Sequence, residues 1–440
     1  MFGTVASVLV VAQTALAAGA TSQASIVDRG ERFVRMLVDG RYDQAVEDFA
    51  PEMRKAMSAT QLGALWKDLV RKNGPLQGTG NGTVKRLGRW RAVFVPCRFA
   101  RASLQLKVVY DQEGLVSGLW VEPAGGEHPY KPPAYVKQDR FFEQPVTLGS
   151  EPWTVHGTLT LPKDARSVPG VVLVHGSGPH DRDETIGPNK PFKDLGWGLA
   201  THGVAVLRYD KRTKVHGARM KVVNMDTVVI QDAVAALETI RTVEQVDPKR
   251  VYVLGHSLGG TLAPHIARRD GNVAGIILTA ASVRPIEDVL VEQAEYLASL
   301  SEAGPHTTSS SLAGLRQLAA GLKSRRLKPE DKLMGAPASF WYDWADHDAE
   351  AALGAAVEFN GRVLVLQGGR DYQVTRQDFA LWERGLPGYP RTTCRLFEDL
   401  NHLFMAGKGK ATPAEYQKPG HLDVRVIEMI AKWIVGDESR

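Results

Sequence analysis

The feature that most constrains this chain is an apolar run that leads directly into a serine between two glycines. Residues 251–260 read Val-Tyr-Val-Leu-Gly-His-Ser-Leu-Gly-Gly, and a helical pattern begins at Leu258. A strand that turns sharply into a helix at a serine holds this residue in a strained backbone conformation, and the glycines leave room for neighbouring backbone. At a helix N-terminus, developing negative charge is stabilised. Ser257 is therefore a candidate nucleophile; the alternative is a serine that only caps the helix.

Apolar runs and helical patterns alternate around this segment. The buried strands expected from these runs cover residues 171–175, 204–208, 251–255, 276–279 and 363–367, after a first strand at 153–161. The expected helices cover residues 226–243, 258–269, 376–384 and 424–435. Continuous runs of Val, Ile and Leu are typical of parallel strands that are buried on both faces. The sequence therefore predicts an α/β fold for residues 139–440, with a mostly parallel sheet flanked by helices.

A base and an acid that could activate Ser257 follow it in the chain. Serine is unreactive at its own pKa and needs a neighbouring base. The strand at 363–367 leads into Asp371, and a later strand at 393–397 leads into His402. Side chains that follow parallel strands meet at one edge of the sheet, and the order serine, acid, histidine is that of a known catalytic arrangement. We therefore predict His402 as the general base and Asp371 as the carboxylate that orients it.

Other residues could take these two roles. Asp399 could replace Asp371, but it lies so close to His402 in the sequence that it could not easily reach the ring. His256 and His421 could replace His402. From inside the turn at the serine, His256 should point away from the side of Ser257 where the base must lie, and His421 begins the last helix, so the first assignment is preferred.

Acyl transfer at a serine also needs hydrogen-bond donors for the oxygen that becomes negatively charged. The amide of Leu258, directly after the serine, should be one donor. The loop after the strand at 171–175 should supply the second, because its glycines let the backbone turn an amide inward. Ser177 is the preferred residue for this donor, and Gly176 is the second choice.

The loop that follows, at residues 179–190, carries several charged side chains. They are His180, Asp181, Arg182, Asp183 and Glu184. This group could be mistaken for a metal site, but ligands at fixed spacing on strands are not recognisable. An ion-paired loop that shapes the pocket wall is the preferred interpretation. The sequence therefore gives no reason to expect a metal or a cofactor.

Residues 284–358 interrupt the alternation of strands and helices. They are too many for an ordinary connection between two strands, and they include Tyr296, Trp341, Tyr342 and Trp344. A helical insertion of this kind would cover the active site as a lid. The alternative is an additional packing layer.

The chain before residue 139 has a different pattern. Residues 26–124 show helical spacing first and strand alternation later, with turn residues such as 111–114 between the strands. This pattern predicts a small α+β domain, and no catalytic constellation is recognisable in it. Residues 125–138 are rich in glycine and proline and form the expected linker.

An apolar segment lies at the start of the chain. Residues 5–18 are mostly apolar, and an Ala-Leu-Ala site at 15–17 is followed by a polar spacer. The segment resembles the hydrophobic region and cleavage site of a signal peptide, although no basic residue precedes it, and it is too short to span a membrane. Residues 1–25 are therefore expected to direct export to the periplasm or the medium. A packed N-terminal helix on a cytoplasmic protein is the alternative.

Charge and cysteine content narrow the possible partners. The 440 residues include 54 Lys and Arg and 49 Asp and Glu, for a formal net charge of +5. Basic residues are spread along the chain rather than concentrated in one region, so a nucleic-acid partner is not expected. The densest basic stretch, residues 208–221, is interpreted as a solvated loop or as a rim that attracts anionic substrates. Cys97 and Cys394 are interpreted as isolated thiols.

Several stretches of the larger domain together resemble a known family. They begin at residues 175 (His-Gly-Ser-Gly-Pro-His-Asp-Arg-Asp-Glu), 208 (Arg-Tyr-Asp-Lys-Arg-Thr), 255 (Gly-His-Ser-Leu-Gly-Gly), 364 (Leu-Val-Leu-Gln-Gly-Gly-Arg-Asp) and 400 (Leu-Asn-His-Leu-Phe). With these stretches the chain resembles the bacterial EstD-type carboxylesterases, which are α/β-hydrolases with an additional N-terminal domain. The resemblance implies hydrolysis of short- to medium-chain esters by Ser257, Asp371 and His402, without metal or cofactor. The first domain more distantly resembles the nuclear-transport-factor-like domains that accompany such hydrolases.

Two other kinds of function remain open. A serine peptidase or amidase of the prolyl-oligopeptidase type, or a thioesterase, would use the same triad. Prolyl-oligopeptidase-type enzymes usually carry a large β-propeller, for which the residues before the linker are too few. A binding protein with a vestigial hydrolase domain is the other possibility, and the complete set of candidate catalytic residues argues against it.

Overall fold

The computed structural model describes residues 26–88, 90–123, 130–300, 305–333, 336–347, 349–388 and 390–436. The chain divides into two compact units, Met1–His128 and Pro129–Arg440. Their boundary falls inside the linker expected at residues 125–138. The signal-like segment at residues 1–25 lies outside the described residues. Within the described part of the chain, no helix has both the length and the apolar character that crossing a bilayer requires.

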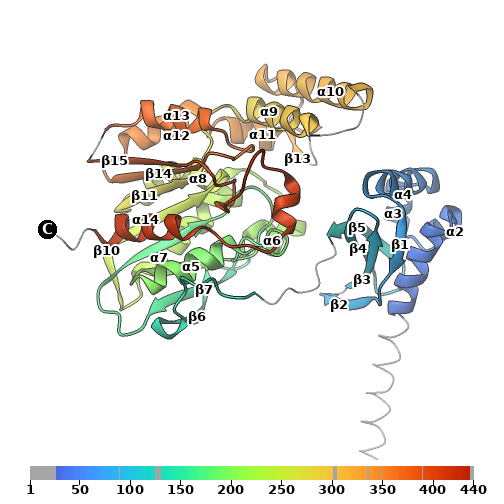
Figure 1. Ribbon diagram of the computed structural model, residues 1–440, viewed down its shortest axis with the longest axis horizontal. Helices are drawn as coiled ribbons and strands as arrows, with labels where there is room; N and C mark the ends of the chain where they lie inside the picture. Colours follow the sequence, from blue (N-terminus) through green and yellow to red (C-terminus); the bar gives the residue numbers. More distant parts are fainter. Residues whose placement is uncertain are drawn as a thin grey trace, which may run out of the picture. The chain divides into compact units, whose positions relative to one another are not determined.

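In the first unit, helices precede an antiparallel sheet (Figure 1). The helices cover residues 26–38, α2 (Tyr42–Glu47), α3 (Pro51–Ala56) and α4 (Ala59–Asn73). The strands are β1 (Leu76–Thr79), β2 (Thr83–Leu87), β3 (Trp90–Phe99), β4 (Ser103–Tyr110) and β5 (Val116–Pro123). β1, β3, β4 and β5 lie side by side in this order, and β2 pairs with β3. The sequence predicts this order of helices followed by a meander.

Local sequence signals set the ends of these elements. Ser58 begins α4 with a capping box, in which its hydroxyl accepts a hydrogen bond from the amide of Gln61 and the Gln61 side chain accepts one from the amide of Ser58. Between β4 and β5, Asp111 accepts a hydrogen bond from the amide of Leu115. Gly114 takes the positive φ of 79° in this turn.

One hydrophobic cluster joins the helices to one face of this sheet. Alternate strand residues point into it, among them Val93 of β3 and Val108 of β4. Cys97 is buried in the same cluster, and burial raises the pKa of its thiol to about 11. Both Cys97 and Cys394, which lies in the second unit, are free thiols.

The second unit is built on an eight-stranded sheet in the order β15-β14-β11-β10-β8-β9-β7-β6 (Figure 1). The strands are β6 (Phe141–Leu148), β7 (Val155–Pro162), β8 (Val168–Val174), β9 (Ala205–Tyr209), β10 (Val246–His256), β11 (Gly275–Thr279), β14 (Arg362–Gly368) and β15 (Thr392–Phe397). The strands from β15 to β9 pair in parallel, and β7 and β6 add an antiparallel edge. This is the mostly parallel sheet that the sequence predicts.

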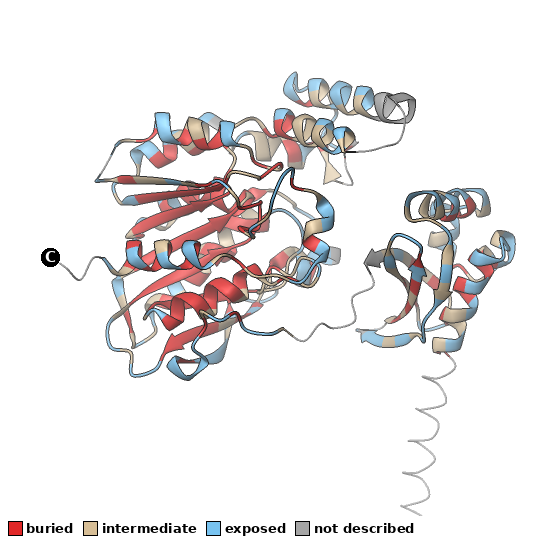
Figure 2. Ribbon diagram, viewed as in Figure 1, coloured by how far each residue is buried: buried red, intermediate tan, exposed pale blue. Residues whose placement is uncertain are grey.

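Helices cover both faces of this sheet. One face packs against α5 (Pro191–Thr201) and α14 (Val424–Val435). The other face packs against α7 (Gln231–Arg241), α8 (Leu258–Asp270), α12 (Ala349–Glu358) and α13 (Arg376–Gly385). Figure 2 shows the central strands buried between these layers. Because both faces are covered, these strands are continuous apolar runs in the sequence.

The basic stretch at residues 208–221 is only partly the solvated loop that the sequence suggests, because Lys214, Arg219 and Lys221 are exposed whereas its first residues are not. Arg208 and Arg212 are buried. The Arg208 guanidinium pairs with Asp183, and the Arg212 guanidinium pairs with Asp232, which is itself buried. These charges are therefore compensated inside the protein rather than displayed to solvent.

The insertion predicted at residues 284–358 consists of two parts. α9 (Ile286–Ser299), α10 (Pro305–Lys323) and α11 (Ala338–Ala345) share a small hydrophobic cluster of their own, which includes Trp341. In contrast, Ala352 and Ala356 of α12 belong to the cluster that covers the main sheet. The predicted insertion therefore extends too far, because its last helix is part of the core layer.

Candidate active site

The passage from β10 to α8 forms a strained turn at Ser257. The backbone of Ser257 has φ 53° and ψ −120°, a conformation that residues with side chains rarely adopt. A Cβ at Gly255 would lie 2.0 Å from the carbonyl oxygen of Gly259, and a Cβ at Gly259 would lie 2.2 Å from the carbonyl oxygen of Val174. The two glycines of the motif are therefore required by the close approach of backbone.

The side chain of Ser257 is not a helix cap. It is partly exposed, and within the described residues it makes no capping hydrogen bond to α8. The amide of Ser257 donates to the carbonyl oxygen of Thr279, which ties the turn to the neighbouring strand β11. The hydroxyl therefore stands at the N-terminus of a 13-residue helix, where negative charge is stabilised.

The structure brings His402 and Asp371 together from separate loops. His402 Nδ1 donates a hydrogen bond to Asp371 Oδ2 at 2.7 Å, and both side chains are buried. The carboxylate also accepts hydrogen bonds from the amides of Gln373 and Val374 and from the Gln367 side chain. These bonds fix its orientation. Because Nδ1 is held in this way, Nε2 is the ring nitrogen left to accept a proton.

His256 links the serine turn to the His402 loop. Its Nε2 donates to the carbonyl oxygen of His402 at 3.0 Å, and the two rings are 4.8 Å apart between centroids. Its Nδ1 lies 3.0 Å from Glu184 Oε2. Burial lowers the pKa of His256, but the charge of Glu184 outweighs this and the net pKa is raised. Both ring nitrogens of His256 face protein oxygens, and this argues against His256 as the base.

The two other rivals also have different partners. Asp399 forms an exposed ion pair with Arg425 at 2.8 Å. His421 Nδ1 pairs with the buried carboxylate of Asp194 at 3.1 Å, and this hydrogen bond raises the pKa of the imidazole. Of the candidate bases and acids, His402 and Asp371 are therefore the two that pair with each other, which is the pairing that the sequence predicts.

The loop after β8 presents its backbone towards the serine. A Cβ at Gly176 would lie 3.2 Å from the Ser257 Cβ. The Gly176 amide, however, donates to Glu184 Oε1 at 2.7 Å. This amide is already occupied, which argues against the second choice made from the sequence. Ser177 and Leu258 are therefore retained as the proposed donors for an oxyanion.

A buried charged cluster supports this loop. Glu184 is buried, and although burial raises the pKa of its carboxyl group, the charge of His256 outweighs this and the pKa falls to about 2. Lys211 Nζ donates to the carbonyl oxygen of Gly176 at 2.6 Å, and burial lowers the pKa of this amine to about 8. The peptide groups on both sides of Gly176 are thus held by buried side chains. This cluster was not predicted from the sequence.

The charged loop at residues 179–190 is ion-paired. Arg182 pairs with Asp210 at 2.5 Å, and Asp183 pairs with Lys190 at 3.2 Å. Across the described residues, no group of three or more His, Cys, Asp or Glu side chains is arranged to hold a metal ion. These ion pairs hold the loop in place, so the loop is ion-paired as the sequence predicts.

Helix α9 contacts the loop that follows Asp371. The Tyr296 ring stacks on Tyr372 with centroids 4.9 Å apart, and its hydroxyl donates to the carbonyl oxygen of Ala411 at 2.8 Å. The insertion therefore contacts, through α9, the loops that follow Asp371 and His402. Trp341, in contrast, lies in the separate cluster of the insertion and donates to the carbonyl oxygen of Leu333.

Comparisons with known proteins show the family of this chain. The family model described as serine aminopeptidase, S33 matches residues 168–406, which is more than half of the chain. The chain belongs to this family. A second family model, described as a protein of unknown function (DUF3887), matches residues 30–119 of this S33-family protein.

The esterase EstD from Thermotoga maritima is a relative over nearly the whole length. It is 36% identical to this S33-family protein over 403 residues, which cover 92% of this chain and 94% of EstD. The resemblance to EstD-type proteins with an additional N-terminal domain is therefore confirmed.

Two solved structures match about two thirds of the chain at lower identity. Est1E from Butyrivibrio proteoclasticus is 13% identical with a TM-score of 0.42, and the match covers 66% of this chain and 95% of Est1E. The esterase domain of a Rhodothermus marinus protein is 17% identical with a TM-score of 0.41, and the match covers 66% of this chain and 97% of that domain.

Proposed function

We propose that this protein is a serine carboxylesterase that hydrolyses short- to medium-chain esters through an acyl-enzyme on Ser257. The observation that carries the proposal is the buried 2.7 Å pair of His402 and Asp371, which the His256 contact ties to the strained turn at Ser257. The name of EstD, an esterase, supports the same class of substrate.

The geometry supports a two-step reaction. Ser257 Oγ forms a bond to the ester carbonyl carbon while His402 Nε2 takes the hydroxyl proton and the carbonyl oxygen becomes negatively charged. The amides of Leu258 and Ser177 would stabilise this oxyanion. The alcohol then leaves with the proton from His402, and water repeats both steps to release the acid. Asp371 stabilises the imidazolium throughout.

Substitution of the triad tests this mechanism. Ser257→Ala and His402→Ala should each lower kcat roughly 10³-fold or more, and the double variant should lose little more because the residues act as a unit. Ser150→Ala and His202→Ala, at exposed positions, are the matched controls and should keep the wild-type rate. A Ser257→Ala protein that retains a tenth of the wild-type rate on a chromogenic ester would overturn the assignment.

A peptidase or amidase is the second candidate, because the matching family model is described as a serine aminopeptidase. The described part of the first unit is a five-stranded sheet with helices and not a propeller. Matched ester and anilide substrates with the same acyl group separate the two functions. We expect the ester to be favoured by kcat/KM. A preference for the anilide would make the protein an amidase, while the triad would stand.

We also propose that the protein is exported to the periplasm or the medium by residues 1–25. The apolar run and the Ala-Leu-Ala site in the sequence support this proposal. Expression with the native start, followed by cell fractionation and N-terminal sequencing, should recover a chain shortened after this site. Recovery of the full-length chain from the cytoplasm alone would contradict export.

A further inference from the structure

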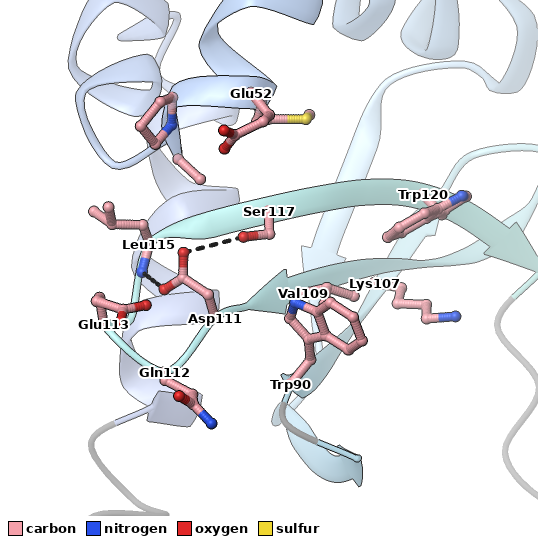
Figure 3. A pocket seen from close by; sticks show the side chains of 13 residues that line it. Glu52, Trp90, Lys107, Val109, Asp111, Gln112, Glu113, Leu115, Ser117 and Trp120 are labelled. Carbon is pink, nitrogen blue, oxygen red and sulfur yellow. Dashed lines mark hydrogen bonds between the residues drawn. The ribbon is translucent and has the colours of Figure 1, made fainter. Parts of the chain in front are cut away.

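The first unit carries a groove on the face of its sheet that points away from the hydrophobic cluster (Figure 3). Successive strand residues point to opposite faces. In β4, Lys107 and Val109 line the groove, whereas Val108 and Tyr110 lie in the cluster. The groove has a volume of about 890 Å³, which is within the size range of small-molecule sites.

Two tryptophan rings line this groove. Trp120 of β5 is 50% exposed, and Trp90 begins β3 on the same face. A Cβ at Gly118 would lie 2.3 Å from the Trp120 ring, so the glycine makes room for the ring to lie along its own strand. The Lys107 ammonium lies 5.2 Å from the centre of the same ring. The ring is thus held in place at the surface, where a large aromatic side chain is not needed for the core.

Polar side chains border the rings. Asp111 is fixed by its own turn, since it accepts hydrogen bonds from the Leu115 amide at 2.7 Å and from the Ser117 hydroxyl at 3.1 Å (Figure 3). Exposed Gln112 and Glu113 follow in the same turn, and Glu52 borders the groove from the first turn of α3. The groove therefore combines aromatic faces with carboxylates and an amide.

The charges of the lining narrow the class of ligand. Among the lining residues, the carboxylates of Glu52, Asp111 and Glu113 outnumber the ammonium of Lys107, with Lys85 close to the Phe94 ring that Lys107 also contacts. This balance of charge disfavours phosphates and nucleic acids. A purely apolar ligand would cover charged groups without giving them hydrogen bonds. A cationic ligand would have to share the Trp120 ring with Lys107.

We propose that this groove binds a neutral oligosaccharide, a function distinct from the ester hydrolysis proposed above. The C–H face of a pyranose ring packs against an indole ring, as flat apolar groups do. Its hydroxyls donate to the carboxylates and exchange hydrogen bonds with the Gln112 amide. A ligand of this kind satisfies both the aromatic and the polar parts of the lining without bringing in charge.

Calorimetric titration of the full chain with cellohexaose, xylohexaose and chitohexaose tests the proposal. The protein carries Ser257→Ala, so that the binding result does not depend on hydrolysis. At least one of the three should bind saturably, and Trp120→Ala or Trp90→Ala should each weaken binding about tenfold or more. Phe142→Ala is the matched control, because Phe142 is 43% exposed and lies on β6 of the second unit. It should bind like the parent protein.

Several results would overturn the proposal. One is the absence of binding by all three sugars at millimolar concentration, and another is unchanged affinity in both tryptophan variants. Binding of tetramethylammonium or inorganic phosphate that is lost in Trp120→Ala would also overturn it, because the groove would then be an ion site. Trp120→Ala in the chain with an intact Ser257 should hydrolyse a small ester at the parent rate, which separates this proposal from the esterase itself.

Discussion

At the scale of single residues, Glu184 joins two parts of the proposed active site. Its Oε1 accepts the amide hydrogen of Gly176, and its Oε2 lies 3.0 Å from Nδ1 of His256, the residue before the proposed nucleophile. One buried carboxylate thereby holds the loop of Ser177 against the serine turn. An active site needs such support, because small displacements of its donors reduce catalysis strongly.

Replacement of Glu184 by Gln should change how stability depends on pH. The pKa of Glu184 falls from 4.5 to about 2 on folding, so the stability it contributes is full above pH 4.5 and is lost as pH falls towards 2. The pKa of His256 is raised, so its contribution is full below pH 6.5 and is lost as pH rises through the raised value. Between these limits Glu184→Gln should lower the free energy of unfolding by about 3 kcal/mol.

Urea unfolding at a series of pH values measures this effect. The difference between the parent protein and Glu184→Gln should shrink as the pH falls below 4.5. Glu398→Gln is the control, since Glu398 pairs with Arg376 at the surface, and such pairs contribute less than about 1 kcal/mol. A difference that stays constant down to the lowest pH would show that Glu184 is not ionised in the folded protein.

The contact between His402 and Asp371 could be predicted from the sequence, whereas the contacts that support the proposed site could not. Ser257, Asp371 and His402 each follow an apolar run, and the ends of parallel strands meet at one edge of a sheet. The pair of Glu184 and His256 has no such signal. It depends on how a long loop folds back onto the serine turn, and no local periodicity encodes that contact.

At the scale of elements, the turn at Ser257 depends on glycines, because a side chain at these positions would clash with neighbouring backbone. Gly259→Ala would place a Cβ 2.2 Å from the carbonyl oxygen of Val174, and backbone cannot yield as a flexible side chain does. We expect a loss of more than about 3 kcal/mol in the free energy of unfolding. Gly314→Ala in α10 has open space around its Cβ and should be neutral or stabilising by about 0.5–1 kcal/mol. Equal unfolding midpoints for the two variants would contradict this account.

The insertion gives different roles to Tyr296 and Trp341. The sequence predicts a lid that includes Trp341 and Trp344, and such a lid could limit the length of the acyl chain. Trp341, however, is 6% exposed in the cluster of the insertion. Trp341→Ala should therefore destabilise the protein by about 3–5 kcal/mol and leave relative rates unchanged. Tyr296→Ala, which removes the contact with Tyr372, should change the preference among esters of increasing acyl length more than the melting temperature.

Melting curves and an ester panel, measured on both variants, distinguish the roles. If Trp341→Ala altered the acyl-length preference while Tyr296→Ala did not, the assignment of the two side chains would have to be reversed. If neither altered it, α9 would be a packing layer and not a lid.

Two elements of the second unit escaped prediction for physical reasons. β6 lies at the edge of the sheet and pairs with β7, so most of its residues are exposed and its sequence lacks an apolar run. α5 contains Gly196 and Gly198, which disfavour a helix. In the folded chain, a Cβ at Gly196 would lie 2.9 Å from the Arg208 side chain, and a Cβ at Gly198 would lie 2.9 Å from the Ile427 side chain. Close packing therefore explains both glycines.

At the scale of the whole molecule, the two units have separate hydrophobic clusters. The cluster of the first unit includes Trp66, and the clusters of the second unit cover the two faces of its sheet. A domain that has its own hydrophobic core usually unfolds as one cooperative unit. Calorimetry should therefore resolve two thermal transitions.

Trp66→Ala should lower only one of these transitions. Trp66 is buried, and its truncation should destabilise the first unit by about 3–5 kcal/mol. The transition of the second unit, followed by the loss of activity on a small ester, should not move. A single transition in which both signals shift together would mean that the units fold as one body.

Because the two units have separate cores, a mutation that unfolds one unit should leave the other folded. A substitution that unfolds the first unit leaves Ser257 and its partners intact, so a laboratory screen with a soluble chromogenic ester would score it as silent. If the groove of the first unit binds an oligosaccharide, as proposed above, the same allele would fail only in an assay that requires this binding. Tolerance maps built from such a screen would therefore carry no information on what the folded part of the first unit binds.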